Sequence, residues 1–142
     1  CTFRVLRLLC MHKKKPTICI IDDESIIIKM YKIKFELNGF TVYTAKDGKS
    51  GIALIVEKRP DAVLLDIVMP EVDGFDVLKV VKKDARVSKI PVILLSNLDS
   101  AKDRRHACEL GALYFLPKAE YLPKEVVKLV KELLLIEHEK IR

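Results

Sequence analysis

Short apolar runs alternate with segments of helical periodicity from residue 16 onward. The runs are four or five residues long and continuously apolar, which is typical of strands covered on both faces of a sheet. They are residues 17–21, 40–44, 62–65, 91–95 and 113–116. The helical segments are residues 25–37, 46–58, 75–83, 100–110 and 123–136. This alternation predicts an α/β fold: one five-stranded parallel sheet, doubly wound, with five helices distributed over both faces.

Breaker residues and apolar stripes support these helices. Asn38-Gly39 predicts the end of the first helix, Pro60 the end of the second, and Gly111 the end of the fourth. The first helix carries a stripe that recurs on one side, formed by Ile26, Met30, Ile33 and Leu37. The last helix has a stripe predicted to be buried, formed by Val126, Leu129, Val130, Leu133 and Leu134.

The charge distribution argues against a nucleic-acid-binding surface. The chain has 142 residues, enough for one domain, and a formal net charge of +6. Residues 1–15 contain five basic residues and no acidic one, so residues 16–142 carry only +1. No concentrated basic stripe is visible in that part. We therefore expect an N-terminal extension, residues 1–15, that is disordered or partly vector-derived, and one globular domain, residues 16–142.

The first ten residues, CTFRVLRLLC, do not read as a targeting segment. They are too short to span a bilayer and lack a secretory cleavage site. Met11, followed by a basic run, is typical of a natural start, so we hypothesise that residues 1–10 are vector-derived or follow from a misassigned start codon.

The four cysteines have neither metal-ligand nor disulfide spacing, and Cys19 lies in an apolar run. A reducing cytoplasm is the expected location.

Polar residues follow four of the five apolar runs. Asp22 and Asp23 follow the first, Asp66 the third, Ser96 the fourth, and Lys118 lies just after the fifth. Each alone has an ordinary explanation as a helix cap, loop residue or surface charge. The carboxyl ends of parallel strands meet at one edge of a sheet, however, so these side chains are expected to converge.

The expected cluster suits phosphoryl transfer. Three neighbouring carboxylates repel one another, and a hard divalent cation such as Mg²⁺ would relieve that repulsion through oxygen ligands. A hydroxyl and an ammonium opposite the cation could hold the remaining phosphoryl oxygens. Such a site works by positioning and by charge neutralisation.

The sequence resembles the CheY-like response-regulator receiver domains of two-component signalling. The resemblance covers about Pro16 to Ile136 and rests on three motifs: IIDDE, LLDIVMPEVDG and GALYFLPK. The first two together are highly specific. The resemblance implies a flavodoxin-like sheet with strand order 2-1-3-4-5. It also implies a phospho-acceptor that catalyses only its own phosphorylation and dephosphorylation and is not otherwise an enzyme.

The resemblance also assigns the metal site. Asp66 would be the phospho-acceptor, and Asp23 and Asp66 would bind Mg²⁺ directly. The backbone carbonyl of Val68 would add a third protein oxygen. Asp22 would act mostly through a metal-bound water.

Three further residues match the family's switch machinery. Ser96 matches the switch hydroxyl, Lys118 the phosphoryl-binding lysine, and Phe115 the switch aromatic. There are two departures. Ala119 follows the lysine where the family usually has a cis proline, which leaves the geometry of that peptide bond open. Phe115 stands where tyrosine is common and has no hydroxyl, and the adjacent Tyr114 would point to the other face of its strand.

The expected partners are a sensor histidine kinase or phosphotransfer protein and a downstream protein. The downstream protein would contact the face of the last two helices. Candidate contact residues there are Lys102, Arg104, Arg105 and Lys124. We expect no direct nucleic-acid binding and no membrane association.

Two other functions compete with this interpretation. A haloacid-dehalogenase-type phosphatase also uses an aspartate nucleophile and Mg²⁺, but it needs an acid two residues after the nucleophile, where this chain has Val68. A receiver-like interaction module that no longer accepts phosphate is the other alternative. Nothing in the sequence favours it, because the acceptor set is intact.

Overall fold

A computed structural model describes residues 15–98 and 100–140, with side chains to residue 135. The strands are β1 (Thr17–Ile21), β2 (Thr41–Ala45), β3 (Ala62–Leu65), β4 (Val92–Ser96) and β5 (Tyr114–Pro117). The helices are α2 (Ser25–Leu37), α3 (Gly48–Lys58), α4 (Gly74–Lys83), α5 (Ala101–Glu109) and α6 (Pro123–Lys140). The expectation for residues 1–10 lies outside the described residues.

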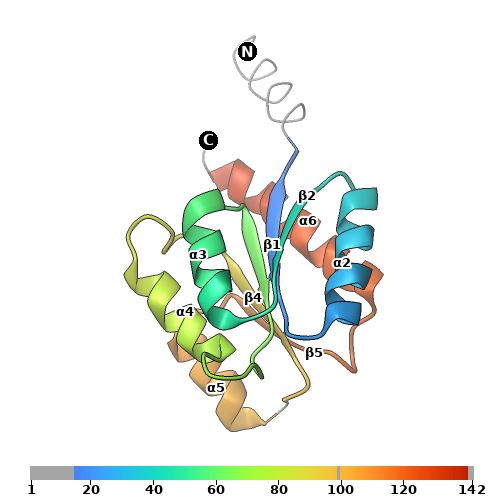
Figure 1. The fold of residues 1–142 in the computed structure, drawn as a ribbon. Helices are drawn as coiled ribbons and strands as arrows, with labels where there is room; N and C mark the ends of the chain where they lie inside the picture. Colours follow the sequence, from blue (N-terminus) through green and yellow to red (C-terminus); the bar gives the residue numbers. More distant parts are fainter. Residues whose placement is uncertain (1–14, 99, 141–142) are drawn as a thin grey trace.

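The five strands form one parallel sheet in the order β2-β1-β3-β4-β5. Helices α2 and α6 lie on one face, and α3, α4 and α5 lie on the other (Figure 1). Each face has its own apolar core, and the strands contribute alternate residues to the two. Cys19, for example, is fully buried in the core beneath α3 and α4. The predicted flavodoxin-like architecture and strand order are confirmed.

Local hydrogen bonds decide where the helices begin. The side chain of Asp47 accepts from the amide of Ser50, so α3 begins at Gly48, two residues later than predicted. Asp73 and Asp76 cap α4 reciprocally, each side chain accepting from the other's backbone amide. The second, fourth and fifth strands each begin one residue later than predicted, at Thr41, Val92 and Tyr114.

Helix α2 packs on the sheet with a different face from the stripe seen in the sequence. Its buried side chains are Ile28, Tyr31 and Phe35. From the sequence stripe, by contrast, three side chains are mainly exposed to solvent: Ile26 at 80%, Ile33 at 58% and Leu37 at 77%. The helix itself is confirmed. It carries two apolar stripes on opposite sides. One is buried against the sheet, and from the other only Met30 packs against the core.

Two further expectations concern single features of the chain. Gly111 ends α5 with φ +96°, a left-handed conformation that suits glycine, as predicted. The described residues contain no cis peptide bond, so the bond between Lys118 and Ala119 is trans. No helix within the described residues has the length and apolar character needed to cross a membrane.

Candidate acidic site at the carboxyl edge of the sheet

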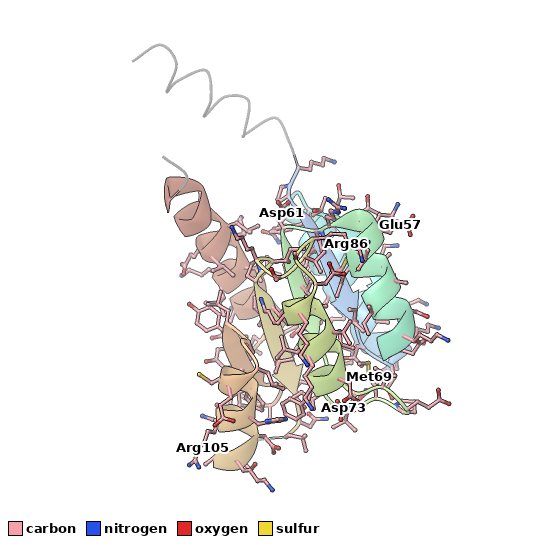
Figure 2. All side chains as sticks on the ribbon, turned by 90° about the vertical axis from the view of Figure 1, so that its left-hand side faces the viewer. Glu57, Asp61, Met69, Asp73, Arg86 and Arg105 are labelled. Atoms are coloured by element: carbon pink, nitrogen blue, oxygen red, sulfur yellow. The ribbon has the colours of Figure 1, made fainter. Side chains whose placement is uncertain are left out.

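Three of the predicted site residues meet at the edge of the sheet where β1, β3 and β5 end. Asp22 directly follows β1, Asp66 follows its neighbour β3, and Lys118 follows β5. Figure 2 shows the same edge from the side, with Met69 and Asp73 at this end and Asp61 at the opposite end. Asp22 and Asp66 are almost fully buried, at 3% and 5% exposure.

Lys118 bridges the two buried carboxylates. Its Nζ donates a hydrogen bond to Asp22 Oδ2 at 2.9 Å and lies 3.5 Å from Asp66 Oδ2. The other carboxylate oxygens accept from backbone amides: Asp22 Oδ1 from Glu24 and Asp66 Oδ1 from Ile67, both at 2.9 Å. Each buried carboxylate therefore has one oxygen bound to the backbone and one directed toward the ammonium.

Asp23 completes a cluster of three carboxylates. One oxygen from each of Asp22, Asp23 and Asp66 lies within 4.8 Å of the other two. Asp23 is exposed while the other two are buried, so the cluster opens to solvent on the side of Asp23. With three carboxylates and one ammonium, the group has a formal charge of −2, which matches a divalent cation. Clustered carboxylate oxygens are also the ligands that Mg²⁺ prefers.

Burial and neighbouring charge both disfavour the charged form of Asp66. Burial raises the pKa of Asp66 from 3.8 to about 6, and the charge of Asp22 adds to that rise. Lys118 and the Ile67 amide oppose the shift without cancelling it. Burial alone would lower the pKa of Lys118, but its hydrogen bond to Asp22 and the charge of Asp66 raise it above its ordinary value. The lysine therefore stays charged, and the cluster still favours an additional cation.

Ser96 and Phe115 lie on the last two strands, Ser96 at the end of β4 and Phe115 within β5, three residues before Lys118. Ser96 is fully buried at the end of β4, where its hydroxyl accepts from the Leu98 amide at 3.2 Å. The backbone of Lys118 donates to the carbonyl of Ser96 at 2.8 Å, which ties the lysine to the strand that carries the hydroxyl. Phe115 is half-buried against the core beneath α4 and α5, whereas its neighbour Tyr114 is exposed.

The loops around the cluster carry two apolar positions. Val68, two residues after Asp66, has a side chain that is 55% exposed. Leu98, two residues after Ser96, is half-buried and packs against the core beneath α4 and α5.

Some features of the site have no clear sequence signal. The guanidinium of Arg104 lies 5.9 Å from the centre of the Phe115 ring, a cation–π contact between α5 and β5. Gly74 packs its Cα against the backbone of Asp66 and Ile67, and its amide donates to the Ile67 carbonyl at 2.8 Å. Here the glycine fixes the start of α4 against the end of β3.

Comparison with known proteins identifies the family. Residues 18–131 match the response regulator receiver domain, and the chain belongs to that family. Receiver domains are signalling modules rather than conventional enzymes.

Among its relatives, the chain is similar to the DNA-binding dual master transcriptional regulator RpaA of Synechocystis, with 39% identity over 72% of this chain and 43% of that protein. It is also similar to the response regulator PleD of Caulobacter vibrioides, with 37% identity over 71% of this chain and 22% of that protein. Among solved structures, the Francisella response regulator 1452 receiver domain matches with a TM-score of 0.79 and 32% identity, over 86% of this chain and 98% of that one. The chain thus spans less than half the length of these curated relatives.

Proposed function

We propose that the domain accepts a phosphoryl group on Asp66, with one Mg²⁺ bound beside it, and passes the signal to a protein partner. The observation that carries the proposal is the buried cluster at the sheet edge. There Asp66 Oδ2 lies 3.5 Å from the Lys118 ammonium, and one Asp66 carboxylate oxygen lies within 4.8 Å of an oxygen from each of Asp22 and Asp23. The family to which the chain belongs supports the same role.

The ligands for the cation would be Asp23, Asp66 and the backbone carbonyl of Val68. Asp22 would act through a water. The fit rests on oxygen donors, on a formal charge of −2, and on the raised pKa of Asp66. Burial and the charge of Asp22 disfavour the charged form of Asp66, and a bound cation would favour that form. When bound, Mg²⁺ neutralises charge on the phosphoryl oxygens. In this assignment, Asp23 is a solvent-exposed metal ligand, whereas Asp66, the phospho-acceptor, is a buried one.

The chain's own residues would position both reactants. Asp66 Oδ1 is held by the Ile67 amide, so Oδ2 is the oxygen free to attack phosphorus. Its attack breaks the bond between phosphorus and the donor, a histidine nitrogen or an acetyl oxygen, and forms an acyl phosphate. Lys118, already within 3.5 Å of Oδ2, would then pair with a phosphoryl oxygen, and Ser96 would donate to another.

The donor in this proposal is a sensor histidine kinase or phosphotransfer protein. The output is a contact on the face of α5, β5 and α6. Movement of Ser96 toward the phosphoryl group would vacate the space that lets Phe115 turn inward, and this would alter the face that bears Lys102, Arg105 and Lys124. The relatives named above include a DNA-binding regulator, but the proposed contact of this domain is with protein.

Beryllofluoride, which mimics a phosphoryl group on aspartate, tests the proposal. With Mg²⁺ present, we expect amide NMR shifts in the loops around Asp22 and Asp66 and also along α5 and β5. The Asp66→Asn variant is the control and should show neither set. Shifts confined to the acidic loops would contradict the coupling to α5, and no shifts at all would contradict the acceptor role.

The lifetime of the phosphoryl group gives a separate prediction. Water must attack phosphorus in line, and Val68 and Leu98, each two residues beyond a site residue, would flank that approach. Neither can orient water or accept its proton, so we expect slow loss of phosphate. The double variant Val68→Asn/Leu98→Glu should decay at least about tenfold faster, measured after the donor is removed. An apolar control, Val68→Ile/Leu98→Met, should decay like wild type. Equal decay of both double variants would show that these positions do not set the lifetime.

A further inference from the structure

Helix α2 carries an apolar stripe that the described part of the chain leaves largely exposed. Ile26, Ile33 and Leu37 are 80%, 58% and 77% exposed, and Met30 between them is partly buried because it also packs against the core. At about 100° per residue, these three exposed positions lie on the opposite side of the helix from its buried residues, Ile28, Tyr31 and Phe35. A helix that is apolar on both sides is expected to be covered on both.

The spacing of the stripe is that of a coiled-coil seam. Its steps of four, three and four residues are those of alternating d and a positions in a heptad. Ile26 and Ile33 then occupy d positions, and Met30 and Leu37 occupy a positions. The stripe therefore suits pairing with another helix along its whole length, rather than contact at one end.

Antiparallel pairing with a second copy matches both the apolar and the charged residues. Ile26 of each copy then meets Leu37 of the other, and Met30 meets Ile33. Lys29 and Glu36 lie on the same side of the stripe. In this register, Lys29 of one copy and Glu36 of the other are offset by only about 3 Å along the axis. Two symmetric ion pairs would form, and such self-complementarity is what a two-fold interface requires.

Parallel pairing of the same helices would be opposed by charge. It would bring Lys29 of one copy toward Lys34 of the other, at positions that flank the seam on the same side. Both Lys29 and Glu36 are exposed, and neither forms an ion pair within the described residues, so both are available to a second copy. We propose that α2 is a self-association surface through which two copies of this chain pair antiparallel.

The pairing should be weak and dependent on concentration. Each copy contributes four seam residues, far fewer than the roughly 20–30 residues that each partner contributes to a standard protein–protein interface. The experiment is sedimentation equilibrium of the full chain from micromolar to millimolar concentration, with a thiol reductant to exclude disulfides through Cys108. We expect a reversible monomer–dimer equilibrium that Ile33→Asp abolishes.

Charge exchange tests the orientation. Lys29→Glu alone and Glu36→Lys alone should each weaken the dimer about tenfold, because both ion pairs become repulsive. The double variant Lys29→Glu/Glu36→Lys should restore it, and Lys32→Glu, which lies off the seam, should leave it unchanged. A dimer strengthened by Lys29→Glu alone would indicate parallel pairing and overturn the proposal. A chain that stays monomeric at millimolar concentration would also overturn the proposal, even if the stripe bound a helix of another protein.

Discussion

Gly74→Ala should destabilise the domain by about 3 kcal/mol, a large effect for a single methyl group. A Cβ at this position would collide with the carbonyl oxygen of Asp66 and would lie 2.7 Å from the Cα of Ile67. Both are backbone atoms at the end of a buried strand, so neither can turn aside as a side chain would. The start of α4 must move instead, which strains its capping box and its hydrogen bond to Ile67.

Urea unfolding followed by circular dichroism measures this effect, and Gly39→Ala is the matched control. Gly39 has φ +86° and open space around its Cα, so alanine there costs only backbone strain, about 1 kcal/mol. We therefore expect Gly74→Ala to cost clearly more than Gly39→Ala. The reverse order would show that α4 can shift from the end of β3 with little loss, and the account of Gly74 would be wrong.

Asp66→Asn should raise the free energy of unfolding at pH 7.5, without divalent cations, by about 2–3 kcal/mol. The cause is the raised pKa of Asp66, about 6 in the folded state against an ordinary 3.8. Between those values the folded protein holds a proton that the unfolded chain has released. The stability of the wild type therefore falls as the pH rises from about 4 to about 6, and it stays lower above that range.

The pH dependence is the control for this prediction. Near pH 4 the gain from Asp66→Asn should disappear, because a protonated aspartate carries no charge to bury. Asp23→Asn, which removes the exposed carboxylate of the same cluster, should stabilise less at pH 7.5. Adding Mg²⁺ should stabilise the wild type more than it stabilises Asp66→Asn, and so reduce the difference between their free energies of unfolding. If Asp66→Asn were no more stable than wild type at pH 7.5, the charged form of Asp66 would not be destabilised by its surroundings, and the prediction would be wrong.

The sheet and the polar residues at its edge could be predicted because both follow from simple rules. Apolar strands that alternate with helices along the chain favour a parallel sheet over any other sheet arrangement. The carboxyl ends of its strands then bring Asp22, Asp66 and Lys118 together although 96 residues separate the first from the last. The acidic cluster needed no knowledge of side-chain packing.

Other features depend on tertiary contacts that periodicity does not encode. Helix α2 has apolar residues on two opposite sides, and the sequence does not say which side meets the sheet. The structure places Phe35 inside and Ile33 outside. Likewise, the approach of Gly74 to Asp66 and of Arg104 to Phe115 depends on how α4 and α5 dock on the sheet.

The most direct test of the account is phosphoryl labelling of Asp66. The chain is incubated with acetyl phosphate and Mg²⁺, and its intact mass is measured, followed by peptide mapping. We expect the mass of one phosphoryl group to be added on Asp66, lost on acid or base treatment as an acyl phosphate is. Labelling should be absent in Asp66→Asn and without Mg²⁺. An acid-stable mass gain that persists in Asp66→Asn, or a phosphoryl group mapped to another residue, would contradict the account.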